Sequence, residues 1–135
     1  MQSKFNKNIK NPFRNGRVFC LCLFFTGLIG YAQPHLKFTD SKKNFGFVKK
    51  GEVVKMDFEF TNTGNQPLLI SAANVECSCT TVEFPKQPVM PAQTGTLTVN
   101  FDTKSVYDRQ DRTVEIVSNA KTAQQKIRFK GVVLK

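Results

Sequence analysis

Apolar and polar residues alternate one by one along several segments of this chain. Within Glu52–Thr61, four apolar residues (Val54, Met56, Phe58, Phe60) alternate with three charged ones (Lys55, Asp57, Glu59). A period of two places the apolar set on one face of an extended strand. Thr96–Asp102 and Gln125–Val133 repeat the pattern, and no 3.6-residue periodicity follows Gln33. These segments are predicted to be half-buried antiparallel strands.

Further strands are expected between clusters of turn residues. The shorter candidates are Leu36–Phe38, Phe45–Val48, Leu68–Ser71, Thr80–Phe84 and Val114–Val117. Asn62–Pro67 and the prolines Pro85, Pro88 and Pro91 separate them, and the polar stretch Thr103–Arg112 reads as a loop that carries at most a short irregular strand. Seven or eight strands in about 100 residues predict an all-β, immunoglobulin-like antiparallel β-sandwich.

Phenylalanine supplies most of the expected core. Eight phenylalanines follow the first strand's start: Phe38, Phe45, Phe47, Phe58, Phe60, Phe84, Phe101 and Phe129. At about 1.5–3 kcal/mol for each fully buried large apolar side chain, they can sustain a single domain. The chain has no Trp, which argues against an antibody-type domain with its core Trp.

Residues 1–32 have the pattern of a cleavable secretory signal peptide. Five basic residues (Lys4, Lys7, Lys10, Arg14, Arg17) precede the uncharged run Val18–Ile29, and Gly30-Tyr31-Ala32 ends the segment. Cleavage is expected between Ala32 and Gln33, leaving one domain over residues 33–135. The apolar run would make a helix of only ~18 Å, which is too short to cross a hydrocarbon core of ~30 Å. No membrane span is expected in the chain that remains after cleavage. An uncleaved signal anchor is the alternative.

The expected location is the periplasm or the extracellular space. Lipidation of Cys20 or Cys22 is not expected, because Phe19 and Leu21 stand where a small residue is required. Without the leader, the basic residues fall from 20 to 15 against 10 acidic ones. They contain no run of five like charges, so we expect a solvated basic face and no nucleic-acid partner.

Cys77-Ser78-Cys79, followed by Thr80, is the feature that a generic sandwich does not need. Alternate residues of an extended strand lie ~6.6 Å apart, whereas a disulfide needs Cβ atoms ~3.5–4.5 Å apart. A bridge would therefore require a turn at Ser78. It would close a loop of about three residues and stabilise the fold by only ~1.5 kcal/mol.

Three interpretations of these cysteines stay open. The first is structural: a local Cys77–Cys79 bridge or two partly buried thiols. The second is thiol–disulfide exchange or an intermolecular bridge. The third is Cu(I) bound by both thiolates, with Met90 or His35 assisting. The candidate binding or redox residues are therefore Cys77, Cys79 and Thr80, with Met90 as a weak metal ligand.

Catalytic patterns are otherwise missing from the sequence. The single His has no Ser or Cys partner at an informative spacing, so there is little material for a Ser-His-Asp type of triad, and no phosphate-binding or dinucleotide glycine pattern occurs. We therefore expect no enzyme and no cofactor.

Several motifs together resemble the DUF1573 family. They are Asn44–Val48, Gly51-Glu52, Phe58–Gly64, Pro67-Leu68, Cys77–Thr81, Phe101-Asp102, Ser118-Asn119 and Lys130-Gly131, within a match from about Leu36 to Val133. The resemblance implies a small secreted protein of a kind common in Bacteroidetes, with an immunoglobulin-like sandwich akin to the ASH and major-sperm-protein domains. The chain departs from the family at two turns, with Pro91-Ala92 in place of Pro-Gly and Tyr107-Asp108-Arg109 where Gly is frequent.

The functional expectation is a non-enzymatic binding or structural module outside the cytoplasm. Its partner would be another extracytoplasmic protein or an envelope component, bound through loops or an open sheet edge. The alternative is a periplasmic thiol-redox or Cu(I)-handling protein that uses the Cys-Ser-Cys element.

Overall fold

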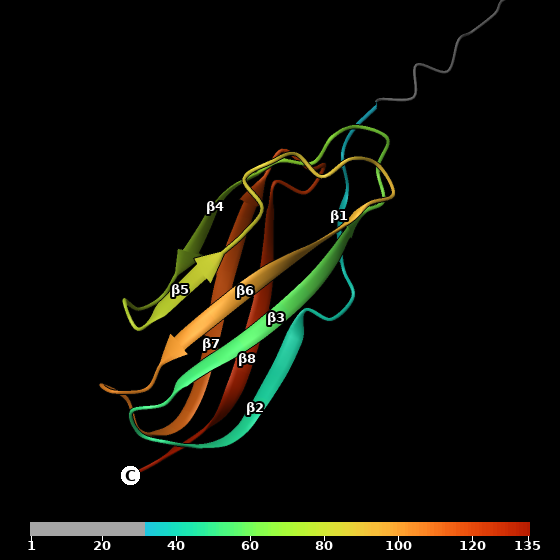
Figure 1. Ribbon diagram of the computed structural model, residues 1–135. Helices are drawn as coiled ribbons and strands as arrows, with labels where there is room; N and C mark the ends of the chain where they lie inside the picture. Colours follow the sequence, from blue (N-terminus) through green and yellow to red (C-terminus); the bar gives the residue numbers. More distant parts are fainter. Residues whose placement is uncertain (1–31) are drawn as a thin grey trace, which may run out of the picture.

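The computed structural model describes residues 32–135, which form eight β-strands and no helix. In chain order these are β1 (Leu36–Phe38), β2 (Lys42–Lys49), β3 (Val53–Asn62), β4 (Ile70–Val75), β5 (Thr80–Glu83), β6 (Thr94–Asp102), β7 (Asp108–Ser118) and β8 (Gln124–Leu134). They make two four-stranded sheets that face each other, in the orders β1-β3-β6-β5 and β2-β8-β7-β4 (Figure 1). This confirms the predicted all-β sandwich. The predicted signal peptide lies outside the described residues, apart from Ala32.

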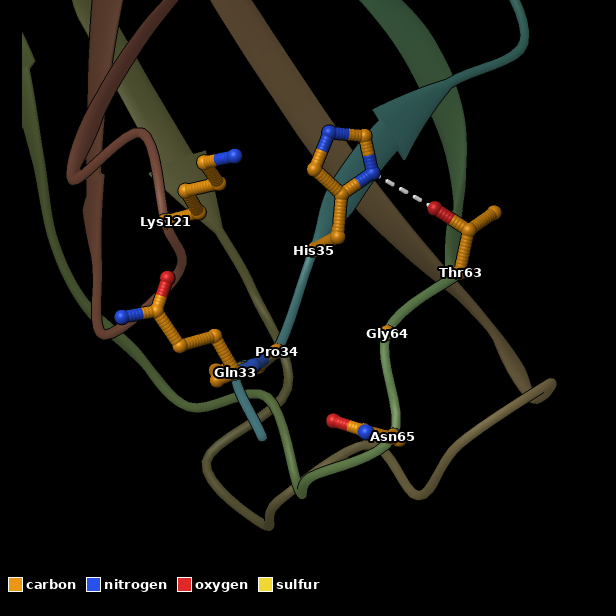
Figure 2. Close-up of a pocket in the computed structure, with 7 residues that line it drawn as sticks. All are labelled: Gln33, Pro34, His35, Thr63, Gly64, Asn65 and Lys121. Atoms are coloured by element: carbon orange, nitrogen blue, oxygen red, sulfur yellow. Dashed lines mark hydrogen bonds between the residues drawn. The ribbon is translucent and has the colours of Figure 1, made fainter. Parts of the chain in front are cut away.

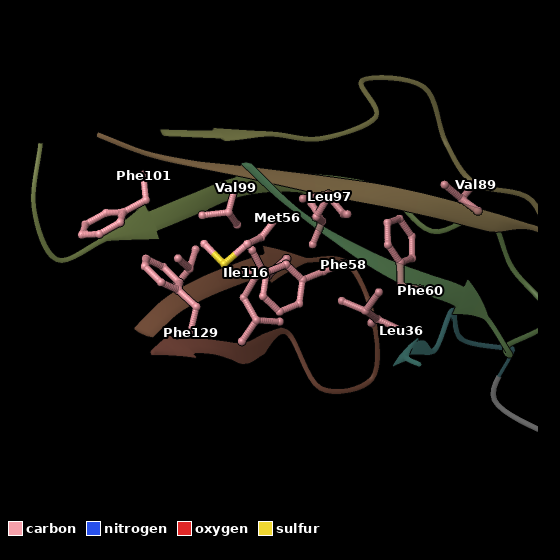
Figure 3. Packing of buried hydrophobic residues seen from close by; sticks show 14 of the residues in the cluster. Leu36, Met56, Phe58, Phe60, Val89, Leu97, Val99, Phe101, Ile116 and Phe129 are labelled. Atoms are coloured by element: carbon pink, nitrogen blue, oxygen red, sulfur yellow. The ribbon is translucent and has the colours of Figure 1, made fainter. Parts of the chain in front are cut away.

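The core fills the space between the two sheets, as the alternation predicts (Figure 3). Phe58, Phe60 and Phe101 of the β1-β3-β6-β5 sheet are fully buried, as are Ile127 and Phe129 of the other. The rings of Phe101 and Phe129 meet across the sheets with centroids 5.3 Å apart. Within residues 32–135, no helix is long and apolar enough to cross a membrane.

Strand β7 begins earlier than the sequence predicts. The expected loop Thr103–Arg112 contains its first residues, because pairing with β8 continues to Asp108 opposite Val133. The inward positions at this end are polar, which hides the alternation. Gln110 is buried, donates to the backbone oxygen of Tyr107 at 2.7 Å and accepts from Arg112 at 3.1 Å.

Strand β2 departs from expectation in two ways. It pairs with β8 in parallel, so the sandwich is not wholly antiparallel. The register also shifts between Asn44 and Gly46, where Gly46 has a φ of +72°. Such a bulge adds one residue to the strand and reverses the faces beyond it. Phe45 therefore packs against the core, while Phe47, which was predicted to be buried, is 76% exposed.

The turn Asn62–Pro67 needs glycine for space. Gly64 does not have a positive φ, so left-handed backbone freedom is not the reason for glycine at this position. A Cβ on Gly64 would instead lie 2.7 Å from the Cα of Pro34, too close for any other residue. Glycine is required here because two backbone segments touch.

Candidate functional sites

The Cys77–Cys79 bridge closes the turn that carries the chain from β4 in one sheet to β5 in the other. The two cysteines form a disulfide with their Cα atoms 5.2 Å apart, within the usual range. The backbone turns at Ser78, as the bridge was predicted to require, and Thr80 donates its N–H to the oxygen of Cys77 at 3.2 Å. Of the structural alternatives, the local bridge is the one that forms.

Thr80 lies beneath the bridge and is 5% exposed. Its hydroxyl is 3.8 Å from the sulfur of Cys77 and 3.9 Å from that of Cys79. Asp102 donates its N–H to the oxygen of Cys79 at 2.8 Å and so ties the turn to β6. The hydroxyl of Thr80 is thus in contact with both sulfurs of the bridge.

The other proposed Cu(I) ligands lie on separate elements. Met90 is exposed in the connection between β5 and β6, and His35 lies just before β1. The structure joins Cys77 to Cys79, and within residues 32–135 no three His, Cys, Asp or Glu side chains are grouped so that they could hold a metal ion. Because the bridge uses both sulfurs, Cu(I) binding would first require reduction.

His35 borders an open hollow of about 820 Å³ beside the turn Asn62–Pro67 (Figure 2). Its Nδ1 hydrogen-bonds the hydroxyl of Thr63 at 2.6 Å. The backbone N–H of Thr63 donates to the oxygen of His35, and that of Lys121 donates to the oxygen of Pro34, so both sides of the hollow are bonded to this segment. This arrangement anchors the chain where the described residues begin.

A cationic face lies on the outer surface of the β2-β8-β7-β4 sheet. We define it by Lys42, Arg109, Arg128 and Lys130, which surround Asp111 and line a hollow of about 360 Å³. Strand pairing brings them together: Lys42 lies opposite Arg128, and Lys130 lies between Asn44 and Asp111. These residues come from the consecutive strands β7 and β8 and from β2, which is distant from both in the sequence.

Asp111 is the carboxylate at the centre of the cationic face. Arg128 donates to both of its oxygens, at 2.6 and 2.5 Å. This bonding holds the pKa of Asp111 below its ordinary value of 3.8, and the positive charges of Arg128, Lys130 and Arg109 lower it further. Asp111 thus stays ionised and neutralises Arg128, whereas Lys42, Arg109 and Lys130 form no ion pair within residues 32–135.

The opposite outer face of the sandwich carries a different charge. On the β1-β3-β6-β5 sheet, Lys37 and Lys55 are accompanied by three carboxylates, Asp57, Glu59 and Glu83. Asp57 accepts a hydrogen bond from Thr98 at 2.7 Å, and Glu83 accepts one from Asn100 at 3.1 Å. The excess positive charge is therefore displayed on one sheet.

The sequence predicted a solvated basic face but did not identify the residues that form it, because they make no run of charges. The alternation in Gln125–Val133 did place Lys126, Arg128 and Lys130 on the solvent side. Only the pairing of β2 and β7 with β8 adds Lys42 and Arg109 to that row. The sequence signal for the cationic face was thus the row of basic residues on the solvent side of β8. The strands that pair with β8 had to be known before the rest of the face could be predicted.

Comparison with protein families gives one match. The model of the family described as "Protein of unknown function (DUF1573)" matches residues 36–133. Comparison with curated protein sequences finds no match.

Solved structures share the sandwich. A protein of unknown function from Porphyromonas gingivalis W83 is 18% identical, with a TM-score of 0.65, over 75% of this chain and 48% of that one. The ASH/PapD-like domain 7 of human CEP192 is 8% identical, with a TM-score of 0.60, over 77% and 88%. The secreted serine protease VesC of Vibrio cholerae is 14% identical, with a TM-score of 0.55, over 73% and 23%. The chain thus spans about half of the Porphyromonas protein and a quarter of the protease, and its fold is that of PapD-like, immunoglobulin-like domains.

Proposed function

Since the chain belongs to the DUF1573 family, a family of unknown function, we propose its role from its own surface: it is a non-enzymatic binding module that works outside the cytoplasm. It binds a component of the cell envelope through the outer face of the β2-β8-β7-β4 sheet. The observation that carries this proposal is the cationic face with the exposed ring of Phe47 beside it. Export is supported by the signal-like residues 1–32 and by the Cys77–Cys79 disulfide, a bond typical of oxidising compartments.

The face is a better binding surface than the sheet edges. Two edge strands are short, β1 with three residues and β5 with four. The other two, β2 and β4, each contain a register shift. On β2, the N–H of Gly46 is also bound by the side chain of Asn44 at 2.9 Å. Short, bulged and lysine-bearing edges discourage the addition of a partner strand.

Photo-cross-linking in intact cells tests this proposal. Benzoylphenylalanine in place of Phe47 should form an adduct with an envelope component, because the ring already points to solvent. The same residue in place of Lys55, exposed on the opposite sheet, is the matched control and should form none. Equal labelling at both positions, or labelling at neither, would reject the proposal.

The closed bridge favours thiol–disulfide exchange as a second candidate function. A loop of about three residues gives a disulfide little stability of its own, which suits a bond that is made and broken. Thiol titration of the purified protein in a series of glutathione redox buffers tests this. If the bridge stays oxidised across the range of cellular glutathione potentials, the exchange function is rejected and the Cys77–Cys79 disulfide has a structural role only.

A further inference from the structure

The outer face of the β2-β8-β7-β4 sheet is apolar at one end. Register places Phe47 opposite Val132 and Lys49 opposite Leu134, so three apolar side chains project together. Phe47 is 76% exposed and Leu134 is 45% exposed. A second hollow of about 190 Å³ lies beside Phe47 and Val132. The apolar end is thus a continuous surface, defined here as Phe47, Val132 and Leu134.

The apolar end adjoins the cationic face directly. Asn44, Arg109 and Lys130 line both hollows. Tyr107, 53% exposed, precedes Asp108, which pairs with Val133. The ammonium groups of Lys50 and Lys135 lie 5.8 and 5.5 Å from the centroid of the Tyr107 ring. Exposed aromatic rings among unpaired cations therefore continue to the end of the sandwich.

We infer that this surface docks onto an anionic lipid bilayer, with Phe47 and Leu134 entering the headgroup region and the cationic face lying against the lipid phosphates. The inference rests on the proposed function and names its envelope component. Lipid headgroups accept aromatic and aliphatic side chains at the interface, and an anionic leaflet attracts adjacent Lys and Arg. A soluble polyanion would use the cations and leave Phe47 without a role. A partner strand would need an edge, and the edges are blunted.

The carboxylates near the apolar end and the cationic face do not cancel the positive charge of this surface. Asp111 is bound by Arg128, and Asp108 and Glu52 are exposed nearby. Lys49, Lys50 and Lys135 lie at the same end, beyond the four cations of the face. The excess therefore stays positive where the lipid phosphates would lie.

A tryptophan reporter tests insertion, because the chain contains no Trp of its own. The Phe47→Trp protein is mixed with phosphatidylcholine vesicles that contain or lack phosphatidylglycerol. Its emission should shift to shorter wavelength with the anionic vesicles and be quenched by brominated lipids. Leu69→Trp, at a position 41% exposed and far from this end in the fold, is the matched control and should do neither.

Charge substitution tests the cationic face by vesicle sedimentation. Lys42→Gln with Lys130→Gln should lower the partition coefficient on the order of 20-fold, because each basic residue at an anionic surface contributes about fivefold. Lys37→Gln with Lys55→Gln removes the same charge from the opposite sheet and should change it little. Raising the salt concentration should weaken binding of the unaltered protein.

The membrane inference has clear contrary outcomes. Phe47→Ser should fold normally and lose vesicle binding. If it binds vesicles unchanged, or if soluble polyglutamate is bound as tightly as the anionic vesicles, the face is a polyanion site and the inference is wrong. If vesicles are not bound but benzoylphenylalanine at position 47 still captures an envelope protein, the inference fails and the proposed binding function stands.

Discussion

Ala92 lies in the left-handed region of backbone conformation, with a φ of +65°. A residue with a β-carbon pays about 1–2 kcal/mol in that region, and glycine avoids this cost. Glycine also loses more conformational entropy on folding than alanine does, which cancels part of the gain in stability. Ala92→Gly should therefore raise the free energy of unfolding by about 0.5–1 kcal/mol in urea denaturation. Asp108→Gly, at a φ of +63°, should gain less because Asp tolerates this region better. A destabilised Ala92→Gly protein would contradict this account.

Asn62 holds together three segments around the Asn62–Pro67 turn. It is fully buried, and its oxygen accepts from His35 at 3.3 Å and from Gly64 at 3.0 Å. Its amide donates to the oxygens of Gln66 at 2.7 Å and Val89 at 2.9 Å. Asn62→Ala should lower the free energy of unfolding by about 2–4 kcal/mol, because buried groups lose their partners.

Thermal and urea unfolding check the Asn62 prediction. Asn65→Ala, in the same turn but exposed, is the control and should cost under about 1 kcal/mol. Similar losses in the two variants would mean that the four hydrogen bonds of Asn62 do not stabilise the fold.

Residue positions were predictable wherever strict alternation holds. Phe58, Leu97 and Phe129 are buried as their spacing requires. Phe47 was not predictable, because a bulge at Gly46 depends on how β2 meets β8. Two of the four hydrogen bonds of Asn62 join it to His35 and Val89, each 27 residues away, which no local pattern reveals.

At the scale of elements, the Cys77–Cys79 turn should contribute little stability. A loop of about three residues restricts the unfolded chain weakly, so Cys77→Ser with Cys79→Ser should lower the free energy of unfolding by about 1.5 kcal/mol or less. Urea denaturation of oxidised wild type and the double variant measures the difference. A loss of about 4 kcal/mol would mean that the bridge holds the two sheets together.

The β7–β8 pair carries a pH-dependent contact between Asp111 and Arg128. The folded pKa of Asp111 is lowered, so its stabilising contribution is present above 3.8 and is lost as the pH falls through the lower folded value. Asp111→Asn should therefore be slightly less stable than wild type at neutral pH. The gap should close in acid-denaturation curves as the pH falls below 3.8. If the difference in stability between wild type and Asp111→Asn grew as the pH fell, ionised Asp111 would not stabilise the fold through Arg128.

The sequence predicted all the strands except the first half of β7, but it did not predict which strands pair with one another. Polar inward residues at Gln110 and Arg112 concealed the first half of β7. The parallel pairing of β2 with β8 left no local trace, because a single strand's alternation does not encode the direction of its neighbour. A solvated basic face was expected, but the residues that form it could not be identified for the same reason, because they are gathered by that pairing.

For the whole molecule, export should remove the leader. The purified protein from cells should begin at Gln33 and contain two of the four cysteines, Cys77 and Cys79. Intact mass and thiol counting after reduction measure both. Four thiols and an unprocessed N-terminus would show that the leader is retained.

The neighbouring positions of β2 and β8 place the second strand of the domain beside its last one. During synthesis, β2 has no partner in its own sheet until the final eleven-residue strand has been made. The sandwich therefore cannot close around a partly synthesised chain, and long-range pairing of this kind is slow to form. The domain would therefore stay incompletely folded until β8 has been synthesised.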